Sequence, residues 1–332
     1  MEKIKVSVLM SIYSKEKAEY FRKSLDSILE QTYLPDEIVL VKDGPLTKEL
    51  EEIIKEYKNK VNLKIVPLEK NMGLGLALRE GILNCSNEII IRMDTDDIMH
   101  PNKILEQVKI FDKNKNLILV GTNGYDFNKN QNDILSERIL PEKNEEILRF
   151  SKRRCPFIHA GIGFKKSYVI EAGNYQDCFW FEDYDLFLRM LKLGEGHNIQ
   201  KNLLYIRSNF DVYERRGGIL YIKNEIKALT KFYREGYLNL YYYLTNIVIR
   251  LGVRICGNNL RRMIYKKFLR KELKKKNEKE GLNPEAVTNI VDLQDQTGED
   301  IKVEDFQGIY NGEVIPFNTT PHSTKKSFIG RI

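Results

Sequence analysis

The sequence predicts an α/β fold with a mostly parallel central sheet flanked by helices on both faces. Short apolar runs rich in Val and Ile alternate with stretches of helical periodicity over roughly the first 120 residues. Polar residues follow several of these runs directly, where open parallel sheets bind ligands. The 332 residues include 42% hydrophobic and 30% charged residues, a composition that is typical of a globular protein and excludes a disordered or fibrous one.

Five apolar segments are short enough and sufficiently rich in Val and Ile to be buried strands. They cover residues 4–13, 37–43, 63–68, 88–93 and 117–121. The segments between them have the apolar spacing of helices, and Pro101 lies near the first turn of the last one. These helices are expected at residues 17–31, 47–58, 74–84 and 102–113. Such regular alternation favours parallel strands joined by helical crossovers.

The pattern is less regular from about residue 141 to 210. A helix at 183–193 that ends at Gly194 and a short strand at 203–207 are expected there, and this part is expected to close the site from the other side. Further helices are predicted at 219–235 and 238–279. A membrane-spanning helix is disfavoured because Arg250 and Arg254 interrupt the apolar run.

The net charge of the chain is unevenly distributed. Residues 231–280 carry +10, which leaves −3 for the remainder of a chain whose total is +7. Within this region, residues 258–279 interleave apolar residues with paired bases, as does a helix that lies on an anionic bilayer. A solvated basic helix end or a protein contact is the alternative interpretation.

The four cysteines are widely spaced and there are only four histidines, so neither a zinc framework nor a disulfide scaffold is predicted. The N-terminal residues enter an apolar strand without the features of a secretory signal. We therefore expect the protein to stay in the reducing cytoplasm.

The strongest local motif is Asp94-Thr95-Asp96-Asp97, which directly follows the apolar strand at 88–93. Carboxylates at this density repel one another unless a cation lies among them. Mg²⁺ or Mn²⁺ would relieve the repulsion and hold a diphosphate. The alternative is that these residues only cap the following helix, and the four residues alone leave both interpretations open.

A second acidic pair, Glu182-Asp183, opens a predicted helix behind the aromatic run 179–181. These residues are candidates for a general base beside an aromatic platform for a sugar ring. Favourable interaction with the helix dipole is the alternative. Arg215 and Arg216, followed by two glycines, suit the oxygens of a diphosphate.

The glycine pattern disfavours a dinucleotide-binding dehydrogenase. Gly73 and Gly75 lack the third glycine of a dinucleotide-binding loop, and they follow the third strand instead of the first. The chain contains neither a Walker loop nor the G-x-S-x-G elbow of hydrolases.

Six motifs in order resemble glycosyltransferase family 2, the inverting enzymes with the GT-A type nucleotide-binding fold. The motifs are SVLMSIY, VLVKDGP, NMGLGLALREG, RMDTDD, FEDYDLFLRML and RRGG. The resemblance covers about residues 4–270 and is strongest to the bacterial branch that builds capsule, exopolysaccharide and O-antigen repeat units. It implies a catalytic domain at 1–215. The charge pattern adds a basic helical membrane-surface extension at 216–280, and the acid-rich composition of 281–332, without a sustained period, predicts a loosely ordered tail.

The resemblance implies roles for the donor-binding residues. Asp43 matches the acid that holds the uracil or ribose, and Ser11 and Tyr13 line the same pocket. Asp96 is the implied direct metal ligand, and Asp94 lies nearer the ribose and donor sugar while also serving the metal. Arg215 and Arg216 match a basic loop that closes over the diphosphate.

On the acceptor side, Asp183 matches the catalytic base that deprotonates the acceptor hydroxyl, and Glu182 orients it or the acceptor. His159 and Trp180 fall near the acceptor. The chain departs from the family pattern at Lys42 and Thr95, neither of which removes a required acid. Leu78 and Arg79 also replace a usual Arg-Asn pair.

The resemblance thus implies a metal-dependent inverting hexosyltransferase that uses Mn²⁺ or Mg²⁺. It moves a sugar from a nucleotide-diphosphate donor, a UDP-sugar, to a lipid-linked saccharide during cell-surface polysaccharide biosynthesis. We expect a cytoplasmic protein held peripherally at the inner face of an anionic membrane, without a nucleic-acid partner. The alternatives are a sugar nucleotidyltransferase and a catalytically idle adaptor that binds membrane or nucleic acid.

Overall fold

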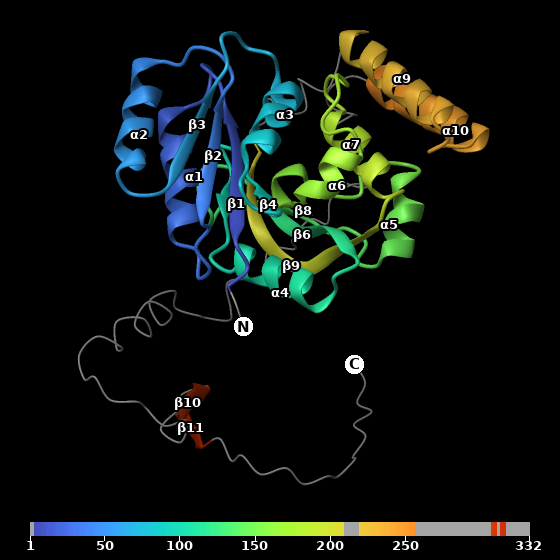
Figure 1. Cartoon of the computed structure of the whole chain (residues 1–332). Coiled ribbons are helices and arrows are strands. Elements are labelled where there is room, and N and C mark those ends of the chain that lie inside the picture. Colours follow the sequence, from blue (N-terminus) through green and yellow to red (C-terminus); the bar gives the residue numbers. More distant parts are fainter. Residues whose placement is uncertain (1–2, 209–218, 256–306, 311–312, 317–332) are drawn as a thin grey trace. The chain divides into compact units, whose positions relative to one another are not determined.

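A computed structural model describes residues 3–208, 219–255, 307–310 and 313–316 (Figure 1). The chain divides into two compact units, Met1–Lys274 and Lys275–Ile332. The predicted basic segment 258–279 and most of the tail lie outside the described residues. In the second unit, β10 (Gln307–Tyr310) and β11 (Glu313–Pro316) form an antiparallel pair that the sequence did not lead us to expect.

The N-terminal half of the large sheet is wholly parallel. Its strands lie in the order β3-β2-β1-β4. Their bounds are β1 (Val6–Ile12), β2 (Glu37–Lys42), β3 (Leu63–Pro67) and β4 (Ile89–Arg92). The crossover helices are α1 (Ala18–Leu29), α2 (Lys48–Lys58) and α3 (Leu74–Asn84). Each of these predicted elements is confirmed to within a few residues.

The second half of the sheet contains antiparallel strands that were not predicted. β8 (Gly163–Lys165) lies antiparallel between β4 and β6 (Leu117–Phe127). β9 (Glu195–Arg207) runs parallel to β6, and β5 (Ile98–Met99) and β7 (Ile134–Arg138) pair antiparallel with β9 and β6. The predicted α/β fold class is confirmed, but the fifth predicted strand, β6, does not adjoin the fourth.

Five further helical segments complete this half of the large unit. Helix α4, predicted at 102–113, is confirmed, as is α7, which begins at the acidic pair. The segments are α4 (Lys103–Lys113), α5 (Asn144–Ser151), the 3₁₀ turn η1 (His159–Gly161), α6 (Lys166–Glu171) and α7 (Glu182–Met190).

Alternate residues of β1 enter two separate cores because successive side chains of a strand point to opposite faces of the sheet. Val8 and Met10 pack with α1, α2 and α4. Leu9 packs on the other face with α3, α6 and α7. The sheet is therefore covered on both faces, and the loops at the carboxyl ends of its parallel strands lie at one edge (Figure 1).

A third core joins α7 to two C-terminal helices, α9 (Ile219–Arg234) and α10 (Leu240–Ile255). Phe181, Tyr184 and Leu188 pack there against Tyr221, Leu229 and Phe232. Among the described residues, no helix combines the length and apolar character that a membrane crossing requires. Helices α9 and α10 therefore pack against α7, the helix that begins at Glu182.

Close packing of α3 on the sheet predicts a cost for any side chain at Gly81. A Cβ there would lie 2.4 Å from Leu9 Cδ1 and 2.8 Å from Val41 Cγ2. We expect Gly81→Ala to lower the free energy of unfolding by about 1–3 kcal/mol in urea titrations. Gly252→Ala in α10 is the matched control, since a Cβ there meets nothing within 4 Å. It should be neutral or stabilising by up to about 1 kcal/mol, and equal effects of the two changes would contradict the packing argument.

Candidate active site

The polar residues singled out from the sequence lie at the carboxyl ends of β1, β2 and β4. Ser11 is half-buried near the end of β1, and Tyr13 is 40% exposed just beyond it. Asp43 follows β2 directly, and Asp94 follows β4. Because these parallel strands are neighbours, their ends bring the predicted donor-side residues to one edge of the sheet.

Asp43 is buried and its carboxylate is held by the loop that precedes α3. Oδ1 accepts a hydrogen bond from the backbone N–H of Met72 at 2.6 Å, and Oδ2 accepts one from Gly73 at 3.1 Å. Gly44 has φ +87°, and a Cβ there would lie 2.7 Å from the backbone nitrogen of Asn71. The chain thus needs a glycine beside Asp43 to bring the two loops together.

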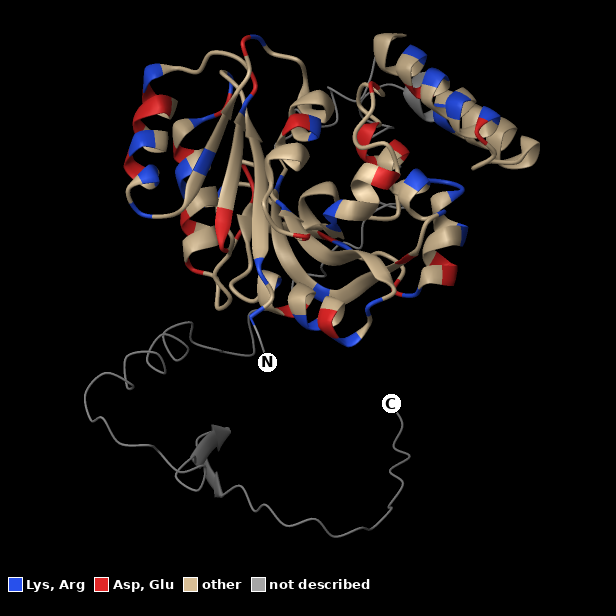
Figure 2. Ribbon diagram, in the orientation of Figure 1, with Lys and Arg blue, Asp and Glu red and all other residues tan. Residues whose placement is uncertain are grey.

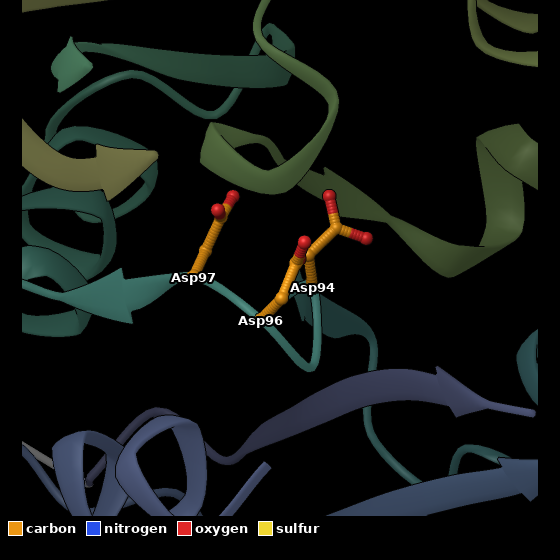
Figure 3. A group of neighbouring side chains, drawn as sticks. All are labelled: Asp94, Asp96 and Asp97. Carbon is orange, nitrogen blue, oxygen red and sulfur yellow. The ribbon is translucent and has the colours of Figure 1, made fainter. Parts of the chain in front are cut away.

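Asp94, Asp96 and Asp97 offer oxygen atoms that all lie within 4.8 Å of one another. Figure 3 shows the three carboxylates carried by one short loop between β4 and β5. The capping interpretation of this motif is wrong, because α4 begins only at Lys103 and its N-cap residue is Asn102.

The aspartate cluster carries more negative charge than its described surroundings balance. Burial, and then the charges of Asp94 and Glu16, raise the pKa of Asp96 to about 7. Burial, followed by Asp96 and Asp94, raises the pKa of Asp97 well above its ordinary value. A hard divalent cation fits this set of oxygen donors, because its charge would offset the repulsion.

The end of β9 supports the loop of the aspartate cluster. The backbone N–H of Arg207 donates to Asp97 Oδ1 at 2.8 Å, and its Nε donates to the carbonyl oxygen of Asp96 at 2.9 Å. The guanidinium also lies over the rings of Tyr20 and Phe127. Sequence reasoning missed Arg207, which is 110 residues from Asp97 along the chain.

Arg92, the last residue of β4, is a second residue that sequence reasoning missed. Its side chain is 1% exposed, and Nη2 forms an ion pair with Asp94 Oδ1. Its Nε and Nη1 have no hydrogen-bond partner in the described part of the chain. Lys103 Nζ donates to the carbonyl oxygens of Arg92 and Ala160, and burial, together with Arg92, lowers the pKa of Lys103 to about 7.

Glu182 and Asp183 stand in the first turn of α7, with no side-chain hydrogen bond capping the helix. Asp183 Oδ1 accepts from the backbone N–H of Tyr184 at 2.7 Å, and its Oδ2 lies 3.8 Å from Cys155 Sγ. A Cβ at Gly75 would lie 2.9 Å from Glu182 Cβ, so the start of α3 packs closely on this turn. Burial, and then the charge of Asp183, raise the pKa of Glu182 to about 7.

An aromatic platform precedes the acidic pair. Trp180 is 39% exposed and stacks on Tyr221 with ring centroids 5.0 Å apart. Its φ of +70° is an uncommon left-handed conformation for a residue other than glycine. Such an outlier beside acidic side chains is a feature found at functional sites.

His159 lies in η1, where its Nε2 is 2.8 Å from the hydroxyl oxygen of Tyr175. Burial, and then the charge of Arg92, lower the pKa of His159 well below its ordinary value. The imidazole is therefore neutral at pH 7, so it can form hydrogen bonds but carries no positive charge.

The electrostatics show that the two acidic motifs share one neighbourhood. After burial, the charges that act on the Tyr175 pKa are those of Arg92, Asp183, Glu182 and Asp94. Arg92 also acts on the pKa values of Asp96 and Glu182, so the structure brings the aspartate cluster and the α7 acids close to one buried guanidinium. Arg215 and Arg216, predicted to contact the diphosphate, lie outside the described residues.

The comparisons with known proteins agree with this architecture. The model of the family described as "Glycosyl transferase family 2" matches residues 7–172. The chain belongs to glycosyltransferase family 2. It is 37% identical to the UDP-Gal:alpha-D-GlcNAc-diphosphoundecaprenol beta-1,3-galactosyltransferase of Escherichia coli, over 81% of this chain and 98% of that protein. It is 39% identical to the amylovoran biosynthesis glycosyltransferase AmsE of Erwinia amylovora, over 67% of this chain and 83% of that one.

Solved structures of other glycosyltransferases share the fold. TarS of S. aureus in complex with UDP-GlcNAc superposes with a TM-score of 0.58 at 17% identity, covering 74% of this chain and 72% of that one. The mannosyltransferase PcManGT of Pyrobaculum calidifontis in complex with GDP-Man and Mn²⁺ gives 0.52 at 15% identity, covering 77% and 71%. This member of glycosyltransferase family 2 is a glycosyltransferase with a GT-A type fold, as the sequence predicted.

The raised pKa of Glu182 makes stability depend on pH. The folded chain keeps this proton up to a pH of about 7, whereas the ordinary value is 4.5. The contribution of Glu182 to the free energy of unfolding therefore falls as the pH rises from about 4.5 to about 7.

We expect Glu182→Gln to gain stability relative to the native chain across this window in urea titrations at pH 5 and pH 8. Glu146→Gln, at an exposed position in the first turn of α5, controls for the loss of one charge, and an identical difference for Glu182→Gln at both pH values would contradict the shift.

Proposed function

We propose that the protein transfers a hexose from a UDP-sugar to a lipid-linked saccharide, with inversion at the anomeric carbon, during synthesis of a cell-surface polysaccharide such as a capsule. The observation that carries this proposal is the grouping of the aspartate cluster and the α7 acids close to Arg92. Support comes from the E. coli relative, whose name gives UDP-Gal and a diphosphoundecaprenol-linked sugar, and which this chain matches over almost its full length.

The aspartate cluster is the proposed place of Mn²⁺ or Mg²⁺. Asp96 is the proposed direct ligand, because Asp94 already shares its charge with Arg92 and Asp97 accepts from the backbone of Arg207. Asp94 then faces the donor sugar and contributes to the metal site. A bound cation would offset the charge that builds on the departing nucleoside diphosphate.

The nucleotide end of the donor is proposed to lie at the ends of β1 and β2. Ser11 and Tyr13 line it, and Asp43 contributes by holding the backbone of Met72 and Gly73 in place. Its carboxylate oxygens keep further lone pairs for a ribose or uracil donor group. Arg215 and Arg216, outside the described residues, are proposed to contact the diphosphate.

Asp183 is the proposed base that removes the proton of the acceptor hydroxyl while that oxygen attacks the anomeric carbon. Its Oδ1 is oriented by the N–H of Tyr184, which directs the carboxylate without neutralising it. Glu182 is proposed to orient the acceptor, with Trp180 offering its ring to a sugar face and His159 accepting or donating one hydrogen bond as a neutral ring.

The proposed division of labour follows the sequence analysis. Residues 1–215 carry the chemistry, 216–280 form the membrane-surface extension, and 281–332 have no assigned role. The proposed lipid-linked acceptor favours a position at the cytoplasmic face of the membrane, and the basic segment 258–279 is proposed to contribute to attachment there.

Removal of the proposed base should separate catalysis from donor binding. We expect Asp183→Asn to lower the transfer rate by about 10²–10⁴-fold, while the Kd for the UDP-sugar, measured by calorimetry with Mn²⁺, stays unchanged. The matched control is Asp177→Asn, an exposed acid six residues earlier. Unchanged turnover of Asp183→Asn would remove this residue from the role of base.

Donor and metal should stabilise the native chain together. In thermal unfolding, UDP with Mn²⁺ at about one hundred times Kd should add about 2.7 kcal/mol of stability, a rise of several degrees in Tm for a domain of this size. Asp96→Asn should lose the Mn²⁺-dependent part of the rise, and Asp177→Asn should keep it. A rise with GDP in place of UDP would change the proposed donor, and a rise that does not depend on Mn²⁺ would reject the metal.

A further inference from the structure

Helix α10 has a large apolar face that no described residue covers. Three apolar side chains spaced four residues apart lie on this face, together with two side chains next to them in the sequence. The exposed fractions of the five side chains run from 51% to 71%. They are Leu240, Tyr241, Leu244, Val248 and Ile249. We call this set the outer face of α10. Contiguous exposed apolar residues of this kind mark interaction surfaces.

The opposite face of α10 is packed and hydrogen-bonded, so the helix is held in a defined orientation. Tyr243 stacks on Tyr233 with ring centroids 4.9 Å apart. Asn246 donates to the carbonyl oxygen of Lys152, and Arg250 donates to Glu225 and to the carbonyl oxygen of Arg153. The outer face is thus not needed to pack the helix onto the protein.

The charge around the outer face is positive. The sequence of α10 itself contains Arg250 and Arg254 and no Asp or Glu. Lys152 and Arg153 are exposed, and their charged groups lie 5.6 and 5.9 Å from the ring centroid of Tyr242. On α9, Lys223 and Lys227 are exposed, and basic residues dominate the charges visible on this helix pair in Figure 2. The surface combines apolar and cationic groups, which is the composition of helices that lie in the boundary of an anionic bilayer.

We propose that the outer face of α10 docks on an anionic lipid surface, with its apolar side chains among the upper acyl segments and Lys152 and Arg153 at the headgroups. Tyr241, at the start of the helix and 65% exposed, suits the interface between headgroups and hydrocarbon. A second copy of the chain fits less well, since a twofold contact would bring the same basic residues against themselves.

This docking would set the position of the proposed base relative to the membrane, an inference that rests on the proposed lipid-linked acceptor. The third core joins α10 and α9 to α7 through Phe181 and Tyr184, the residues on either side of the acidic pair. Cys155, which follows the basic run 152–154, contacts Asp183. The docking surface and the acidic pair therefore belong to one packed body, and a lipid-linked sugar would meet the acids at a fixed height.

Vesicle binding of the full chain tests the proposal. Vesicles of phosphatidylcholine with about one third phosphatidylglycerol are sedimented with the native protein, with Leu244→Gln/Val248→Gln, and with Leu83→Gln/Ile170→Gln as a matched control at exposed positions of α3 and α6. The α10 variant should bind at least about tenfold more weakly, and the control should bind as the native chain does. Because both pairs of changes are at exposed positions, unchanged thermal unfolding verifies that each variant folds.

Lipid charge and oligomeric state complete the test. Binding should weaken on pure phosphatidylcholine and at 0.5 M salt, roughly as screening of the basic residues requires. Vesicle binding of the α10 variant equal to the native chain would overturn the proposal, as would a native dimer that the same changes dissociate in the absence of lipid. Transfer to a short water-soluble acceptor is measured in parallel. If the native chain transfers sugar neither to this acceptor nor to a lipid-linked one, the proposed function is rejected but the docking surface is not.

Discussion

The ion pair between Arg92 and Asp94 is the contact on which the architecture of the site depends. Three aspartates lie in the short loop that follows β4, and two further acids lie nearby in the first turn of α7. Charges of one sign gathered with little water repel each other and shift toward their neutral forms. The Arg92 guanidinium is 1% exposed and acts electrostatically on Asp96 and on Glu182, one acid of each group. Removing the partner of a buried ion costs about 3–5 kcal/mol.

The antiparallel part of the sheet delivers the residues that surround this ion pair. β8 pairs with β4, and the backbone N–H of Arg92 bonds the carbonyl oxygen of Ile162, which brings His159 and η1 to the end of β4. β9 ends at Arg207, beneath the loop of the aspartate cluster. The parallel half of the sheet thus supplies the aspartate cluster, and the mixed half supplies Arg207, His159 and the acids of α7.

The sequence could predict the parallel half because each of its strands is a self-contained apolar run that needs helical crossovers. It could not predict β5 and β8, because strands of two and three residues exist only through pairing with distant strands. The acids were found for a local reason, their density after an apolar run. Arg92 was overlooked although a charge at the end of the run IIIRM was a signal, since a buried strand tolerates a guanidinium only beside an anion.

Charge balance in the structure separates acids that are paired with basic side chains from acids that lie beside like charges. Asp185, fully buried in the same helix turn as Asp183, is matched by Arg189 at 2.7 Å and by Lys231 of α9. The Asp185 carboxylate thus links α7 to α9 through an ion pair. In the part of the chain that the structure describes, neither Glu182 nor Asp96 forms an ion pair, and burial beside like charges raises the pKa of each to about 7. A positively charged group brought among these acids would lower the pKa of each, and acids with pKa values shifted in this way gather at functional sites.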